Sequence, residues 1–330
     1  MKRNLLIALF LIWASSLFAL EQPKFSTAGF YELPNTGREV YSMNLAWRFY
    51  KGDVVGTPFA TGFDDSGWEV ISIPHGLEYL PIEASGCANY QGVAWYRKRF
   101  TLDSRLKGKQ LFIHFEAIMG KSEVYVNGKL LKKQYGGYLP VILDVTNELD
   151  WDGENVIAVK ADNSDDPSYP VGKPQNLLDF TYFGGIYRDC WLVAHNKVFI
   201  TNANYENEVA GGGLFVSFAD VSEKSAIVNL KAHVRNLSEK NERVTVTFNL
   251  KNKSGEVVKQ VFKKVSVRKG KAGYAVASIG IDSPSLWSPE TPYLYNLDVT
   301  VTTDAGTVVD GYRQRSVSAA LSLSRRKDCG

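Results

Sequence analysis

The sequence predicts an all-β protein built from two β-sandwiches. Past residue 30, short runs rich in β-branched and aromatic residues alternate with turns rich in Gly, Asn and Asp. No amphipathic helical period persists there for three turns. With 330 residues, the chain favours two domains over one.

The first block of expected strands is typical of a jelly roll. These strands cover residues 110–115, 122–126, 155–160 and 189–194. Asn127 and Gly128 predict a type I′ hairpin turn, because both residue types accept the positive φ angles that this turn requires. We therefore expect a jelly-roll sandwich over residues 20–195.

A second β-rich block begins near Val198 and is typical of an immunoglobulin-like sandwich. The expected strands cover residues 228–234, 244–250, 274–281 and 294–301. Ser254 and Gly255 mark a hairpin turn within this block. Strands at this regular spacing over about 100 residues favour an immunoglobulin-like domain. We place the domain boundary within 196–204 and assign residues 196–315 to the second domain.

The composition is that of a folded protein without a strong charge preference. Hydrophobic residues make up 45% and charged residues 22%, so disorder is not expected. The net charge is only +3 and no long basic stripe occurs, so we expect no nucleic-acid partner. Four tryptophans fall in strand patterns, which favours core packing over sugar stacking: Trp47, Trp68, Trp95 and Trp191.

The N-terminus predicts export from the cytoplasm. Lys2 and Arg3 precede an apolar run over residues 5–17, and Ala19 suits a cleavage site. The run is shorter than the ~20 residues that a membrane-spanning helix needs. We therefore expect a signal peptide over residues 1–19, a secreted or periplasmic protein, and no membrane association after cleavage.

The cysteines and the asparagines give weaker signals. Cys87, Cys190 and Cys329 are too few and too scattered for a disulfide framework or a metal site. A bridge between Cys87 and Cys190 and buried free thiols both stay open. Asn236 and Asn252 each begin an Asn-x-Ser pattern for glycosylation, a pattern short enough to arise by chance.

An ordered series of motifs carries a family resemblance over residues 40–315. The motifs are residues 63–68 (FDDSGW), 95–100 (WYRKRF), 124–128 (VYVNG), 136–140 (GGYLP), 155–163 (NVIAVKADN), 179–189 (DFTYFGGIYRD), 286–295 (LWSPETPYLY) and 313–315 (RQR). This set resembles the sugar-binding and immunoglobulin-like domains of glycoside hydrolase family 2, which includes β-galactosidases, β-glucuronidases and β-mannosidases.

The resemblance implies a retaining hydrolase of terminal β-linked sugars, most similar to β-galactosidases. Retaining hydrolysis needs two carboxylates about 5–5.5 Å apart. In the family both are Glu residues of a (β/α)₈ barrel of about 250 residues, which would follow the second domain. Only residues 316–330 follow Arg315. The resemblance therefore implies that the catalytic barrel is missing and that the chain is inactive by itself, which leaves its status as an enzyme open.

The catalytic acid of the family is a Glu preceded by Asn, and three such pairs occur here. They are Asn147-Glu148, Asn207-Glu208 and Asn241-Glu242. All three fall in expected turns of β-sandwiches, where a solvated turn is the better interpretation. We assign no catalytic residue to this chain.

Residues 316–330 depart from the family pattern. A Phe-Gly-hydrophobic-Arg strand would follow in a family member. Codons for residues 316–321 can be chosen so that a shift of the frame by one base spells Phe-Gly-Ile-Arg-Ser-Ile. We favour a frameshift after Arg315 over a genuine polar tail.

The resemblance gives Asp179 a role in sugar binding. Asp179 lies seven residues before Ile186, where β-galactosidases carry an Asp that enters the sugar pocket, in some members beside a sodium ion. A carboxylate can accept two hydroxyl donors at once, which suits a diol edge. The alternative, a loop Asp that caps Thr181 or a nearby amide, stays open. No other cofactor is expected.

Asn89 and Tyr90 are the other candidate substrate-binding residues. They lie in a long loop before the strand of Trp95, and such loops often reach the pocket in this family. A structural surface loop is the alternative. We expect Arg188 and Asp189 to form a structural pair at the domain interface.

Two further hypotheses concern the chain as a whole. It is expected to bind a β-linked carbohydrate, and the missing barrel would be its main protein partner. The first alternative is a secreted carbohydrate-binding module that works alone, because jelly rolls often bind sugars. The second is a structural scaffold whose barrel-facing surface is exposed.

His75, after Pro74, is expected to be a packed histidine rather than a substrate ligand.

Overall fold

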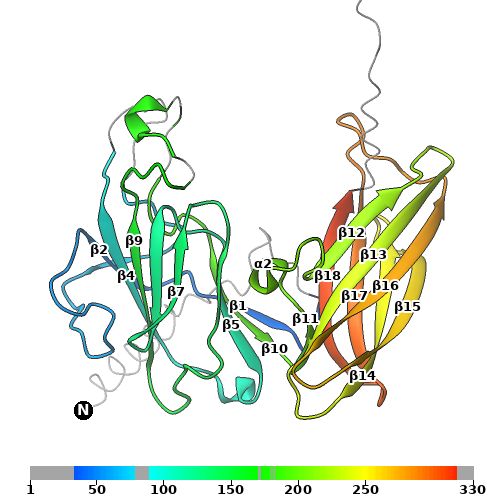
Figure 1. Cartoon of the computed structure of the whole chain (residues 1–330), viewed down its shortest axis with the longest axis horizontal. Coiled ribbons are helices and arrows are strands. Elements are labelled where there is room, and N and C mark those ends of the chain that lie inside the picture. The colour runs from blue at the N-terminus through cyan, green and yellow to red at the C-terminus, as the bar shows by residue number, and fades with distance from the viewer. Residues whose placement is uncertain (1–32, 79–88, 170–171, 179, 181–182, 318–330) are drawn as a thin grey trace, which may run out of the picture.

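The computed structural model describes residues 33–78, 89–169, 172–178, 180 and 183–317. Within these residues nearly all of the regular secondary structure is antiparallel β-strand, arranged in two sandwiches that lie next to each other (Figure 1). This confirms the predicted all-β class. The expected signal peptide, Asp179 and Cys87 lie outside the described residues.

The first sandwich is a jelly roll of two sheets. One has the order β1 (Glu39–Ser42), β10 (Cys190–His195), β5 (Gln110–Phe115) and β8 (Val141–Asp144). The other has the order β3 (Glu69–Ile71), β2 (Trp47–Lys51), β4 (Val93–Phe100), β9 (Asn155–Asp162), β6 (Lys121–Val126) and β7 (Lys129–Tyr135). Two short 3₁₀ turns accompany them, η1 (Ser104–Leu106) and η2 (Gln175–Leu177).

Alternation of buried and solvent-facing residues explains why these segments form strands. In β6 every second side chain, including Val124 and Val126, is fully buried against the opposite sheet. β5 and β10 are instead buried on both faces, because the second domain covers their outer side. The four tryptophans named above are all buried, as predicted.

The turn between β6 and β7 has the predicted form. Asn127 has a φ of 48° and Gly128 a φ of 84°, so both central residues are left-handed as a type I′ turn requires. This turn matches the right-handed twist of the two strands and sets their register.

The second sandwich also has two sheets. One joins β11 (Val198–Ile200), β13 (Ser225–Asn236) and β12 (Leu214–Ala219), and β16 (Ala272–Asp282) pairs with β13. The other has the order β15 (Val257–Val267), β14 (Glu242–Lys251), β17 (Leu294–Thr303) and β18 (Val308–Val317). A single helical turn, α2 (Ala203–Glu206), follows β11. β18 continues through Val317, which pairs with Leu294.

Three of the candidate modification sites can be placed, two asparagines and one cysteine. Asn236 is fully buried, and its side-chain amide donates to the carbonyls of Lys240 and Val267 at 2.8 and 2.9 Å. Asn236 therefore holds a turn and cannot accept a glycan in the folded protein. Asn252 lies partly exposed beside the β14–β15 turn. Cys190 is a buried free thiol whose pKa is raised by burial.

A buried ion pair joins the two sandwiches. Arg38, beside β1, donates through Nε and Nη2 to the two carboxylate oxygens of Asp310 on β18, at 3.0 and 2.8 Å. Nη2 also donates to the Ile200 carbonyl, and the Ile200 amide donates back to Asp310 at 2.7 Å. Burial disfavours the charged form of Asp310, but the neighbouring Arg38 guanidinium holds the pKa of this carboxyl at about 2. The pair therefore stays ionised at ordinary pH.

Apolar side chains also pack together at this interface. They form a cluster of Val40, Phe112, Ile142, Trp191, Val193 and Phe199. The rings of Phe112 and Phe199 meet edge to face with centroids 6.1 Å apart. The outer face of one jelly-roll sheet thus becomes a core between the domains.

The prediction that Arg188 and Asp189 form a structural pair is wrong. Asp189 accepts a hydrogen bond from the side-chain amide of Asn44 at 2.7 Å. Arg188 is exposed and lies over the ring of Tyr187. No ion pair joins Arg188 to Asp189 within the described residues; the Asp189 carboxylate accepts from Asn44 instead.

Replacing Arg38 should weaken the coupling between the sandwiches. In Arg38→Met the buried Asp310 carboxylate loses its counter-charge, so the free energy of unfolding should fall by about 3–5 kcal/mol. Urea denaturation at pH 7 measures this. The control is Arg105→Met, since the pair of Arg105 with Asp103 is exposed to solvent and should contribute little to stability. Equal losses in the two variants would contradict the role given to Arg38.

Two buried histidines predict sensitivity to acid. Burial lowers the pKa values of His195 and His114 to about 4. Both must stay neutral when folded but take up a proton near pH 6.5 when unfolded, so stability is lost as pH falls from 6.5 to 4. Each should cost up to about 3 kcal/mol over this window. Urea denaturation from pH 7 to pH 4.5 should show a smaller pH dependence in His195→Gln; an unchanged slope would contradict this.

Candidate functional site

Two of the predicted substrate-binding residues, Asn89 and Tyr90, lie in loops at one end of the jelly roll. These loops precede β4 and follow β9, and they stand at the top of the first sandwich in Figure 1. Loops on a rigid sandwich are the usual carriers of binding residues. We call residues 76–78, 89–92, 163–178 and 183–185, within the described part, the loop cluster.

Asn163 is the centre of the loop cluster. Its side chain is 2% exposed. Its amide oxygen accepts from the Gly92 backbone N–H at 2.9 Å, and its amide nitrogen donates to the Tyr90 carbonyl at 2.7 Å. Gln175 donates to the Asn163 carbonyl at 3.2 Å. One buried residue therefore links the segment of Tyr90 and Gly92 to the turn around Gln175.

Gly184 makes room for this arrangement. A Cβ atom at Gly184 would lie 2.6 Å from the side-chain nitrogen of Asn163, closer than any side chain allows. The Gly184 carbonyl also accepts from the Leu77 amide at 3.1 Å. The segment that follows Asp179 is thus fixed against the loop that carries Glu78.

Tyr90 is held by its own contacts. Its backbone amide donates to Glu78 Oε2 and its hydroxyl donates to the Val93 carbonyl, both at 2.7 Å. The ammonium group of Lys51 lies 5.2 Å from the centre of the Tyr90 ring. Because the hydroxyl is already used, Tyr90 has a structural role here. Its contact with substrate stays a prediction.

Asn89 precedes Tyr90 and is partly buried beside the same loops. Sequence reasoning brought Asn89, Tyr90 and Asp179 to one pocket. The structure gathers Asn89, Tyr90 and the segment at Gly184 at one end of the sandwich, while Asp179 lies outside the described residues. The sodium ion expected beside Asp179 therefore stays a prediction.

Sequence reasoning missed Glu78, Asn163 and Gln175. Asn163 closes the motif of residues 155–163, but nothing in that motif indicates that its side chain reaches Tyr90 and Gly92. His75, in contrast, is packed as predicted. It is 9% exposed, and its Nδ1 lies 3.1 Å from the Tyr96 hydroxyl.

Large apolar side chains are exposed at the edge of the loop cluster. They are Leu177, Phe180 and Phe183. Such a group on a polar surface is typical of a site that a ligand or another domain covers.

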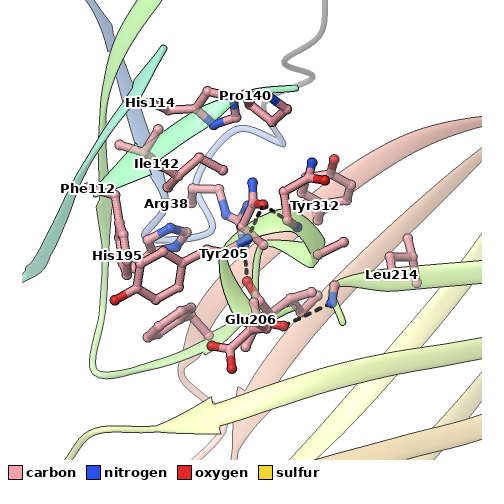
Figure 2. Close-up of a pocket in the computed structure, with 18 of the residues that line it drawn as sticks. Arg38, Phe112, His114, Pro140, Ile142, His195, Tyr205, Glu206, Leu214 and Tyr312 are labelled. Carbon is pink, nitrogen blue, oxygen red and sulfur yellow. Dashed lines mark hydrogen bonds between the residues drawn. The ribbon is translucent and has the colours of Figure 1, made fainter. Parts of the chain in front are cut away.

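A cavity lies between the two domains, away from the loop cluster (Figure 2). This cavity of about 300 Å³ has Phe112, Ile142 and Val193 on the jelly-roll side and α2 on the other. Some polar side chains that line it already have partners in the protein. Glu206, for example, accepts a hydrogen bond from Arg235 at 2.8 Å. The cavity contains neither Asn89 nor Tyr90, and we regard it as part of the interface.

The described residues limit the chemistry of the chain. No three His, Cys, Asp or Glu side chains among them gather as a metal site. No helix in the described part is long and apolar enough to cross a membrane. The three Asn-Glu pairs lie in turns or at a strand start, as expected, and not at the ends of barrel strands.

Comparison with known proteins identifies both domains. A model described as the sugar-binding domain of glycosyl hydrolases family 2 matches residues 62–196, and the model of glycosyl hydrolases family 2 matches residues 214–316. The β-galactosidase BoGH2A of Bacteroides ovatus is 33% identical over 88% of this chain and 32% of its own length. The β-galactosidase of Thermoanaerobacter pseudethanolicus is 31% identical over 84% of this chain and 35% of its own length.

Solved structures show the same partial coverage. A β-glucuronidase of Bacteroides uniformis matches with a TM-score of 0.74 and 28% sequence identity. The match covers 85% of this chain and 32% of the β-glucuronidase chain. The chain therefore spans about a third of the length of the relatives it matches.

Removing the Asn163 side chain should loosen the loop cluster. Asn163→Ala leaves the partly buried Gly92 amide and Tyr90 carbonyl without their side-chain partner, which should cost about 1–3 kcal/mol of unfolding free energy. Asn163→Asp keeps only the acceptor, so its loss of unfolding free energy should lie between zero and that of Asn163→Ala. Urea denaturation and hydrogen exchange of the Gly92 amide measure both effects. The control is Gln91→Ala, because the hydrogen bond that Gln91 donates to Asp165 at 3.1 Å is exposed to solvent and should contribute less than the bonds of Asn163; unchanged protection of Gly92 in Asn163→Ala would refute the role.

Proposed function

Because the chain belongs to glycoside hydrolase family 2, we propose that it forms the N-terminal, sugar-binding part of a secreted, retaining β-glycosidase that is β-galactosidase-like. The main support is that both family domains are present in order, with the loop cluster formed at one end of the first. The closely similar relatives are named β-galactosidases and β-glucuronidases, so a β-linked sugar is the substrate class.

In this proposal the chain binds and orients the sugar but does not cleave it. Asp179, Asn89 and Tyr90 contact sugar hydroxyls, through the carboxylate, the amide and the ring respectively. Asn163 holds the loop of Asn89 and Tyr90 in place. A sodium ion beside Asp179 would neutralise its charge in the full-length enzyme.

Retaining hydrolysis requires an acid–base carboxylate and a nucleophilic carboxylate. We propose that a barrel domain supplies both, as in the family, and that the 330-residue chain is inactive by itself. Residues 1–19 act as the export signal in this proposal.

A stand-alone carbohydrate-binding module is the second candidate. The exposed Phe180 and Phe183 beside the loop cluster favour it, because aromatic rings at a rim can stack on a sugar without a barrel. The same exposed rings would also suit a scaffold that covers them with another domain.

Sequencing the DNA through and beyond the codon for Arg315 tests the main proposal. We expect a shifted frame that continues into a barrel with an Asn-Glu acid and a second Glu. A stop after Gly330 with no barrel encoded in any frame would instead make the stand-alone sugar-binding module the leading candidate.

An assay of the purified chain is the control for this prediction. With a chromogenic β-galactoside it should show no turnover, because it lacks the carboxylate pair. The β-galactosidase of Thermoanaerobacter pseudethanolicus serves as the positive control. Turnover that rises with the concentration of the purified chain would contradict the proposal that this chain binds the sugar and a separate barrel domain cleaves it.

A further inference from the structure

A groove of about 200 Å³ lies on the outer face of the six-stranded jelly-roll sheet, away from the inter-domain cavity. Side chains of three neighbouring strands, β9, β6 and β7, line it. They are Lys121, Glu123, Lys133, Tyr135, Lys160 and Asp162.

Strand register arranges these side chains in two rows. Lys121 is paired with Asp162 on one side and with Tyr135 on the other. The next row across the same strands is Lys160, Glu123 and Lys133. Residues two apart on a strand share a face, so both rows point outward together. The groove therefore presents fixed donors and acceptors beside an aromatic ring.

Each lysine of the groove has a carboxylate partner. Lys133 lies 2.6 Å from Glu123, Lys121 lies 2.8 Å from Asp166, and Lys160 lies 3.5 Å from Asp53. The remaining carboxylate, Asp162, accepts from the amide and the hydroxyl of Ser164 at 2.9 and 2.6 Å. The groove therefore does not offer an uncompensated positive charge to an anion. It offers alternating acceptors and donors instead, which suit a neutral ligand rich in hydroxyl groups.

Tyr135 forms one end of the groove, and its ring lies beside that of Tyr169, which belongs to the loop cluster. Tyr135 is 63% exposed, and its ring centre lies 6.0 Å from that of Tyr169 at an angle of 40°. The Tyr169 hydroxyl oxygen is buried and has no hydrogen-bond partner among the described residues. An exposed ring beside polar groups provides an apolar surface for the C–H face of a sugar.

We propose that this groove binds one neutral pyranose unit of a glycan. The sugar ring stacks on Tyr135. Its hydroxyls donate to the carboxylates of Glu123 and Asp162 and accept from the ammonium groups of the neighbouring lysines. None of these residues belongs to the loop cluster, so the site goes beyond the proposed function and needs no barrel.

The loop cluster and the groove are close along the chain but separate in the residues they use. Asp162 lines the groove, while Asn163, the next residue, turns into the loop cluster. A glycan held in the groove would therefore be anchored beside the loops that we assign to substrate.

Saturation-transfer NMR of the whole chain with methyl β-D-galactoside and methyl β-D-glucoside tests the site. We expect transfer from protein to sugar at millimolar concentration. Tyr135→Ala should weaken binding about tenfold, because the stacking surface is lost. Tyr135→Phe should retain binding, and Glu123→Gln should weaken it, because a charged acceptor is lost. Phe262→Ala is a matched control, since Phe262 is 64% exposed on the second domain.

The Asn89→Ala variant separates the groove from the loop cluster. A signal that survives Asn89→Ala but is lost in Tyr135→Ala supports the groove, and this holds even if no barrel is encoded. A signal that is lost in Asn89→Ala and unchanged in Tyr135→Ala assigns all binding to the loops and overturns the inference. Absence of transfer to both sugars also overturns it. Circular dichroism of Tyr135→Ala checks that the variant is folded.

Discussion

The buried pair of Arg38 and Asp310 sets how the two sandwiches meet. Each charge would be costly to bury alone, so the pair forms only when the domains come together in one arrangement. The residues are 272 positions apart, beside the first strand of one sandwich and on the last strand of the other. The apolar contact of Phe112 with Phe199 adds area but little direction. The ion pair therefore supplies the specificity of the interface.

The same physics operates at the loop cluster on a smaller scale. Loops contain too few apolar residues to form a core of their own, so buried hydrogen bonds must hold them. Asn163 does this with a neutral amide that acts as both donor and acceptor. A neutral group avoids the desolvation cost of a charge, and its two bonds specify the distance between segments. The binding loops are thereby placed on a rigid support.

Taken together, the loop cluster and the groove suggest how such a chain would handle a glycan. The loops would bind the terminal sugar that is to be cleaved, and the groove would hold another unit on the neighbouring sheet face. This chain spans about a third of its relatives, and the carboxylate chemistry belongs to the remainder in our proposal. Binding and cleavage would then be divided between domains of one protein.

The sequence by itself determined the strands, the Asn127–Gly128 turn, the burial of the tryptophans and the family, because these depend on local alternation, local φ angles and ordered motifs. Only the tertiary structure decided which distant polar groups meet. It paired Asp189 with Asn44, buried Asn236 in a turn, and joined Arg38 to Asp310. Local pattern reports the face on which a side chain lies. The partner that it meets there depends on sheet order and register, which no short stretch of sequence contains.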